Sequence, residues 1–278
     1  MMDTSSLQYC PKSESAFLPI HRYFFIICKC QGFLLLQLFL FFIFLQELSA
    51  STAAHHPSIV KFIFGKENNT YHFSISPKNN YNRRKQQQLI KAFQCFGDLD
   101  NTATYSISLC ADVPDNDSPL KPLKGDETGH VFVILTKRTA STTVSRSFGF
   151  YPKHMLFTVF VHRSRSKIAD NGGRVYDIAI TEKIDAQQFA RLLEYAIELS
   201  YLKYHIKRNN CYHYALALFN FVSEVKLKTT HIRLPFLFGK GGSPCGLYSE
   251  LMKMEKNNPS AVERITRGSF TSPENSCR

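Results

Sequence analysis

The chain is 278 residues long, which gives room for one or two domains and for a substantial buried core. Apolar residues make up 44% of it, and this share excludes a wholly disordered protein. Thirty-four basic residues against 22 acidic ones give a formal net charge of +12. That excess favours contact with a polyanion such as an acidic wall polymer, an anionic lipid surface or a nucleic acid.

An apolar segment near the N-terminus predicts export. Residues Phe33–Leu45 contain one polar member, and this length is typical of a secretory signal rather than of a membrane span. Small residues follow around Ala50, where a signal peptidase could cut. We therefore expect residues 1–50 to be a signal peptide and the protein to reach the periplasm, the cell surface or the medium. The alternative is an uncleaved anchor that associates with the membrane through residues 23–45.

Five of the eight cysteines follow this leader, an odd number for complete pairing in an oxidising compartment. We expect a disulfide between Cys95 and Cys110, and we consider a second one between Cys245 and Cys277. The sequence holds no C-x-x-C pair with the spacing of a zinc site. Neither a metal nor an organic cofactor is expected.

The hydrophobic pattern predicts strands first and helices later, which indicates an α+β fold. One earlier helix is expected over residues 83–96. Asp185 and Gln188 form a capping-box pattern at the start of another, and a third begins after Asn210. A short helix should end near Met254. Strands are expected at Ser58–Phe64, Tyr71–Ser76, Tyr105–Val113, His130–Leu135, Thr142–Phe150, Phe157–His162 and Val175–Thr181.

The candidate chemistry lies at the start of the helix that follows Asn210. Unpaired backbone N–H groups and the helix dipole stabilise a thiolate there, so Cys211 is placed as a nucleophile would be. His130 opens the apolar strand HVFVIL and is the candidate base. The alternative is that Cys211 is an ordinary buried cysteine. His213 should point away from the thiol and serve in packing or hydrogen bonding.

Four motifs together resemble a set of exported bacterial proteins with GH-x-F, GFYP and NC-x-x-F/Y-A signatures. They stand in this chain as GHVFVIL at Gly129–Leu135, FGFYP at Phe148–Pro152, YDIAIT at Tyr176–Thr181 and NCYHYA at Asn210–Ala215. The order of histidine before cysteine is similar to the permuted, NlpC-like branch of the papain superfamily, which includes the lecithin:retinol acyltransferase family.

The resemblance covers roughly Tyr105 to Met254 and implies a permuted papain-like fold, an antiparallel sheet with packed helices. Residues 51–102 would then be an N-terminal extension, 103–254 the papain-like domain and 255–278 a polar tail. The resemblance also implies that Cys211 is the nucleophile and His130 the base. No motif fixes the residue that orients the imidazole, and Ser147 and Arg146 are the candidates.

These features predict an exported cysteine hydrolase, a peptidase or amidase, or an acyltransferase that acts on an amide or an ester. A cell-wall peptide or another part of an anionic cell-wall polymer is the favoured substrate, and a lipid acyl group comes second. The alternative is a non-catalytic surface-binding module of the same fold. A nucleic-acid partner is not expected, because export argues against it. The basic cluster of Arg163, Arg165 and Lys167 could contact phosphates or could be a solvated loop.

Overall fold

The computed structural model describes residues 66–67, 70–71, 80–97, 99, 101–125, 127–155, 158, 161–228, 230–234, 239–258 and 263–276. All of them belong to one compact unit, Ser58–Arg278. Their elements, in chain order, are β1 (Lys66–Glu67), β2 (Thr70–Tyr71), α2 (Asn80–Phe93), the 3-10 turn η1 (Gln94–Phe96), β3 (Thr104–Asp112), β4 (His130–Arg138), β5 (Thr143–Pro152), β6 (Arg163–Ser164), β7 (Ser166–Asp170), β8 (Val175–Ile184), α4 (Ala186–Leu199), β9 (Tyr204–His205), α5 (Cys211–Val222), β10 (His231–Arg233), β11 (Lys240–Gly242), α6 (Pro244–Asn257) and β12 (Ile265–Thr271).

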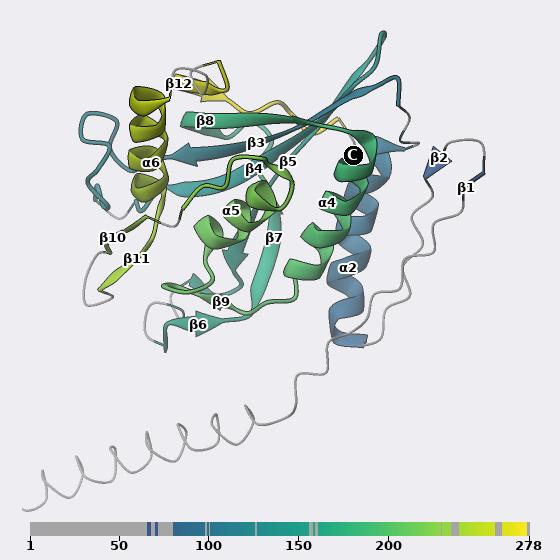
Figure 1. Cartoon of the computed structure of the whole chain (residues 1–278). Helices are drawn as coiled ribbons and strands as arrows, with labels where there is room; N and C mark the ends of the chain where they lie inside the picture. Colours follow the sequence, from purple (N-terminus) through teal and green to yellow (C-terminus); the bar gives the residue numbers. More distant parts are fainter. Residues whose placement is uncertain are drawn as a thin grey trace, which may run out of the picture. The chain divides into compact units, whose positions relative to one another are not determined.

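A six-stranded sheet of order β12-β8-β3-β4-β5-β7 forms the centre of the fold (Figure 1). Every neighbouring pair in it is antiparallel. The strands expected at His130–Leu135 and Thr142–Phe150 are confirmed as β4 and β5. They form an antiparallel hairpin, in which Arg138 pairs with Thr143 and the Thr139 N–H donates to the Thr142 carbonyl at 2.8 Å. The α+β class is therefore confirmed, with a fully antiparallel sheet.

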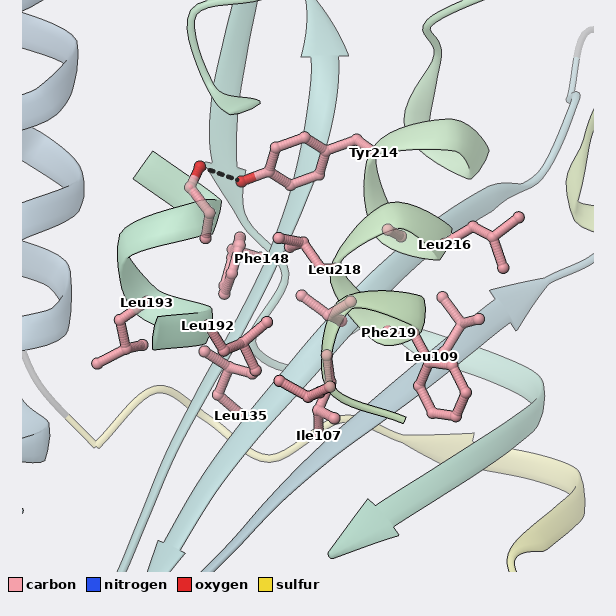
Figure 2. Close-up of a cluster of buried hydrophobic side chains, with 14 of the residues drawn as sticks. Ile107, Leu109, Leu135, Phe148, Leu192, Leu193, Tyr214, Leu216, Leu218 and Phe219 are labelled. Carbon is pink, nitrogen blue, oxygen red and sulfur yellow. Dashed lines mark hydrogen bonds between the residues drawn. The ribbon is translucent and has the colours of Figure 1, made fainter. Parts of the chain in front are cut away.

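Helices α2, α4, α5 and α6 contribute side chains to one hydrophobic core on a single side of this sheet. In the strands, alternate residues such as Ile107, Leu109, Leu135 and Phe148 point into this core because side chains of a strand alternate between its two faces. Figure 2 shows them against side chains of α4 and α5. Burying each such Leu or Phe stabilises the fold by about 1.5–3 kcal/mol. We call this the helix side of the sheet, and the opposite one the outer side.

The predicted helix starts are confirmed in detail. The Asp185 carboxylate accepts from the Gln188 N–H at 2.7 Å, and the Gln188 side chain accepts from the Asp185 N–H at 3.0 Å. The same reciprocal arrangement joins Asn210 and His213 at the start of α5. Ser243 caps α6 by accepting from the Gly246 N–H at 3.1 Å. Capping by these residues satisfies N–H groups that a helix start otherwise leaves unpaired.

Segments at both ends of the predicted domain also join the core or the sheet. Leu89, Phe93 and Phe96, which come from the expected N-terminal extension, are buried in the helix-side core. In the segment expected to be a polar tail, β12 pairs with β8 at the edge of the sheet. The predicted leader, residues 1–50, and the predicted strand at 58–64 lie outside the described residues. No helix in the described part of the chain combines the length and hydrophobicity that a membrane span requires.

The predicted strand at Phe157–His162 is wrong. Among its described residues, Thr158 is helical, and its N–H donates to the His154 carbonyl at 3.1 Å, four residues earlier. The stretch is apolar without a polar alternation, and such a run does not distinguish a strand from a short helix.

Both predicted disulfides are also wrong, because Cys110 and Cys245 are free thiols. Cys110 lies in a small apolar cluster on the outer side of the sheet, whereas Cys95 packs against the helix-side core. The sheet separates them. The Cys245 thiol donates to the Lys121 carbonyl at 3.3 Å, and residue 277 lies outside the described residues.

Candidate active site

The start of α5 is held by Asn210, whose side chain bonds in three directions. Its Oδ1 accepts from the His213 N–H at 3.3 Å and lies 2.8 Å from the His213 Nδ1. Its Nδ2 donates to the carbonyls of Ile206 at 2.9 Å and Gly242 at 2.8 Å. These bonds fix Cys211 as the first residue of α5, where the helix dipole favours negative charge.

The Cys211 thiol is buried, with 8% of the residue exposed. Burial raises the pKa of Cys211 above its ordinary value, while hydrogen bonds from the backbone N–H groups of Val131 and Tyr212 and the charge of Arg174 act in the opposite direction. Tyr204 of β9 also hydrogen-bonds with Cys211, and burial together with this sulfur raises the pKa of Tyr204 well above its ordinary value. The sulfur is thus enclosed by polar groups yet protonated at neutral pH.

His130 begins β4 and lies on the outer side of the sheet, like Phe132 two residues later. Its ring stacks on Tyr151 of β5, with centroids 4.2 Å apart. Burial, with a smaller contribution from the charge of Arg174, lowers the pKa of His130 well below its ordinary value. The imidazole is therefore neutral at pH 7, the state in which a histidine can accept a proton.

The structure brings the two predicted residues to the same end of the sheet, from opposite sides. Val131, which follows His130 directly, points its side chain into the helix-side core, and its backbone N–H hydrogen-bonds the Cys211 sulfur. The ladder between β4 and β5 begins one residue later, at the pair Phe132 and Gly149. Cys211 and His130 thus lie near the point where β4 starts, on opposite sides of the sheet.

Asn171 lies close to His130, and the sequence did not predict it as part of the site. Its Oδ1 and the His130 Nε2 are both buried, and neither has a hydrogen-bond partner among the described residues. Both atoms lie over the Cα of Gly149, since a Cβ built there would overlap the Nε2 and lie 2.6 Å from the Oδ1. The two atoms are therefore no more than about 5 Å apart. Only a glycine leaves room for this approach.

The loop that carries Asn171 also carries Arg174. The Arg174 guanidinium donates to the Asp112 carboxylate at 2.6 Å. Asp112 of β3 is in turn the residue paired with His130 of β4 in the sheet. Its charge acts on both His130 and Cys211. Asn171-Gly-Gly is typical of a turn, and nothing in the sequence pattern places that turn beside His130.

The two residues proposed from the sequence to orient the imidazole are engaged elsewhere. The Ser147 hydroxyl donates to the Pro273 carbonyl at 3.4 Å. Arg146 points to the helix side of the sheet, because its neighbours Ser145 and Ser147 face the outer side. Its Nη2 lies 4.0 Å from the Asp170 Oδ2. His213, by contrast, behaves as predicted and hydrogen-bonds within the cap of α5.

Within the described ranges, no group of three or more His, Cys, Asp or Glu side chains could hold a metal ion. Comparison of the chain with protein-family models, with curated proteins and with solved structures finds no match. The geometry of the site therefore carries the functional argument.

Proposed function

We propose that this protein is a cysteine hydrolase or acyltransferase of the permuted papain-like type, with Cys211 as nucleophile, His130 as base and Asn171 as the residue that orients the imidazole. The observation that carries the proposal is the pair of unpartnered buried atoms, His130 Nε2 and Asn171 Oδ1. Leaving both unsatisfied costs about 1–3 kcal/mol each, so a structural role alone gives no reason to keep them.

In the proposed reaction, the Cys211 sulfur attacks the carbonyl carbon of an amide or ester while its proton moves to the His130 Nδ1. The Nε2–H then donates to the Asn171 Oδ1, which stabilises the imidazolium. The imidazolium gives its proton to the leaving amine or alcohol, and a thioester remains on Cys211. Water releases the acid in a hydrolase, and a second alcohol or amine takes the acyl group in a transferase.

Two groups near the sulfur could stabilise the oxyanion of this reaction. One is the backbone N–H of Cys211, at the start of α5, and the other is the Tyr204 hydroxyl, which hydrogen-bonds with Cys211. Donors aimed at the developing charge in a water-poor site contribute most to acyl-transfer catalysis.

The burial of Cys211 supports the competing reading, a non-catalytic binding module of the same fold. A thiol whose pKa is raised by burial is a weak nucleophile in the resting state. In the catalytic proposal the thiol and imidazole rest as a neutral pair, and the proton moves only when substrate is bound.

Hydrolysis of 4-nitrophenyl butyrate by the full-length chain separates the two readings. We expect Cys211→Ala and His130→Ala to abolish turnover and Cys245→Ala to retain it. Cys245 is a matched control because it is also a free, buried thiol in the first turn of a helix. Burst release of one equivalent of nitrophenol by the wild type would report the acyl-enzyme. Turnover that survives in Cys211→Ala, or is absent from the wild type, favours the binding module.

The proposed approach of the Cys211 thiol to the His130 imidazole can be tested without a substrate. 1,3-Dibromoacetone bridges a thiol and an imidazole that lie close together. We expect a peptide cross-link between Cys211 and His130 that disappears in His130→Ala. Alkylation of Cys211 with no bridge to His130 would contradict the dyad.

We also propose that the protein is exported and acts on an anionic cell-wall polymer, with cell-wall peptide the favoured substrate. The net charge of +12 and the apolar segment Phe33–Leu45 support this location. Sequencing of the N-terminus of the exported protein tests it, and cleavage near Ala50 is the expected result. Recovery of the whole chain in membranes would favour an anchor.

A further inference from the structure

Tyr151 of β5 connects the parts of the candidate active site. Its ring stacks on the His130 imidazole, with centroids 4.2 Å apart and the two planes inclined by 21°. Its hydroxyl accepts a hydrogen bond from the Asn171 Nδ2 at 2.6 Å. The charge of the Cys211 sulfur acts on the same hydroxyl. Tyr151 therefore lies close enough to both members of the proposed dyad to interact with each.

The Tyr151 hydroxyl has a hydrogen-bond donor that the protein does not use. A phenol has one O–H donor, and the bond from Asn171 uses the oxygen only as an acceptor. Among the residues that the structure describes, none accepts a hydrogen bond from this O–H. Accepting the bond from Asn171 polarises the O–H and makes it a stronger donor. Burial raises the pKa of Tyr151 above its ordinary value, so the hydroxyl keeps its proton at neutral pH.

Tyr204, the other tyrosine beside the thiol, is already engaged. Its hydroxyl hydrogen-bonds with Cys211, and its side chain is buried. His130, Asn171 and Cys211 are buried as well, whereas Tyr151 is partly exposed. The free O–H therefore belongs to the member of this set that is most accessible to an entering substrate.

Packing holds the Tyr151 side chain in place at both ends. The register that pairs Phe132 with Gly149 places Tyr151 beside His130, two residues further along β5. The ring passes close to Gly149, where a Cβ would lie 3.1 Å from the Tyr151 Cε2. Stacking on His130 fixes the ring, and the bond from Asn171 fixes the hydroxyl. A donor held in this way needs little reorganisation when charge develops in a reaction.

We propose that Tyr151 is a further catalytic residue, whose hydroxyl donates a hydrogen bond to the carbonyl oxygen of the acyl substrate. This inference rests on the proposed function and adds a substrate contact to it. When the Cys211 sulfur bonds to the carbonyl carbon, an electron pair of the double bond moves to this oxygen, and the Tyr151 O–H stabilises the resulting negative charge. The hydroxyl keeps its own proton throughout, because the leaving group takes its proton from the His130 imidazolium.

Tyr151→Phe tests this role, because it removes the hydroxyl and keeps the ring that stacks on His130. On 4-nitrophenyl butyrate we expect kcat to fall about a hundredfold, the size of effect that loss of one oxyanion donor causes. On the matched thionoester, in which sulfur replaces the carbonyl oxygen, the fall should be about tenfold smaller, because sulfur is a weak acceptor.

Tyr176→Phe is the matched control for this substitution. Tyr176 is also a partly exposed tyrosine, but its ring packs on Phe132 and Phe270 instead of on His130. We expect Tyr176→Phe to leave the rates on both esters unchanged. Equal losses on the ester and the thionoester in Tyr151→Phe would overturn the proposal.

Loss of the hydroxyl also frees the Asn171 side chain, and a double variant separates this effect from a contact with substrate. If Tyr151 contacts the substrate itself, Tyr151→Phe/Asn171→Ala should turn over the ester more slowly than Asn171→Ala alone. A double variant as fast as Asn171→Ala would show that Tyr151 acts only by holding Asn171, and would overturn the proposal.

A second substitution keeps the test available if Tyr151→Phe does not fold, which circular dichroism would show. 3-Fluorotyrosine incorporated at position 151 by amber suppression keeps the ring and the hydroxyl, and its fluorine makes the O–H a stronger donor. The ratio of kcat on the ester to kcat on the thionoester should then rise. An unchanged ratio would contradict a hydrogen bond to the carbonyl oxygen.

Failure of this inference is distinguishable from failure of the proposed function. Turnover that requires Cys211 but is unaffected by Tyr151→Phe would leave the proposed function standing and refute the role of Tyr151. A wild type that turns over neither ester would overturn both.

Discussion

The Asn171 side-chain amide donates to the Tyr151 hydroxyl at 2.6 Å, and the same tyrosine ring stacks on His130. Tyr151 thus holds both the imidazole and the amide that lies next to it. Since the amide Nδ2 is committed to Tyr151, the Oδ1 is the atom left for the His130 Nε2. This arrangement gives Asn171 a role that can be separated from packing.

Substitution of Asn171 should change the titration of His130. In Asn171→Ala we expect kcat/KM to fall about tenfold to a hundredfold, less than in His130→Ala, because the imidazole keeps its place against Tyr151 but loses its acceptor. In Asn171→Asp the new carboxylate favours imidazolium and raises the pKa of His130. The acidic limb of the pH profile of kcat/KM should therefore move to higher pH.

A purely structural role for Asn171 predicts another outcome. Asn171→Asp would then lower the melting temperature without moving the acidic limb of the profile. Circular dichroism melts of the same samples provide the comparison, and an unmoved limb in a folded, active Asn171→Asp variant would contradict the assignment.

Tyr204 should set the acidity of the thiol. A hydroxyl that hydrogen-bonds with the sulfur stabilises the thiolate, so Tyr204→Phe should raise the pKa of Cys211 further and slow its alkylation by iodoacetamide at pH 8. The comparison is Tyr195→Phe, on α4, whose ring stacks on Phe221 instead. Unchanged alkylation in Tyr204→Phe would show that its hydroxyl does not act on the sulfur.

Local signals in the sequence predicted the elements that carry the site. Asp185 with Gln188 and the position of Asn210 before an apolar run indicate helix starts, because the caps bond to groups only three residues away. The β4–β5 hairpin was also predictable, since it joins neighbours across a short turn. These elements already place Cys211 at a helix start and His130 at a strand start.

Relations between distant segments were not predictable in the same way. Asn171 meets His130 because β7 and β8 lie far apart in the sheet order and the loop between them crosses near β4. The failed pairing of Cys95 with Cys110 has the same origin. Sequence distance suggested a bridge, but the sheet lies between the two side chains.

The end of the chain should support the loop of Asn171. Ser272 bonds to this loop from both sides: its hydroxyl donates to the Asn171 carbonyl at 2.5 Å, and its N–H donates to the Arg174 carbonyl at 2.8 Å. Truncation after Thr271 should lower the free energy of unfolding by about 2–4 kcal/mol, at about 1 kcal/mol per lost bond. It should also reduce turnover.

Truncation after Ser276 is the matched control for this prediction, because it keeps all of these bonds. Urea unfolding of the two truncated chains gives the comparison. Equal midpoints would show that Ser272 and the residues after it do not hold the loop.

The cap of α5 predicts a pH-dependent stability that can be assigned to one residue. Burial, together with smaller contributions from the charges of His231 and His205, lowers the pKa of His213 to about 4. An unfolded chain binds this proton near pH 6.5, so the folded state, with the lower pKa, loses stability as the pH falls from about 6.5 towards 4. Since the ring is partly exposed, we expect this loss to reach about 1–3 kcal/mol.

His213→Gln isolates this contribution. Glutamine at the third helical position completes a capping box with Asn210 and does not titrate. Unfolding measured in urea at pH 7 should give nearly equal stability for His213→Gln and the wild type. At pH 4.5 the wild type should have lost more stability than His213→Gln. The difference between their free energies of unfolding should vary with pH as expected for the uptake of one proton. Parallel decline of the two proteins would mean that His213 is already solvated and that other groups cause the acid sensitivity.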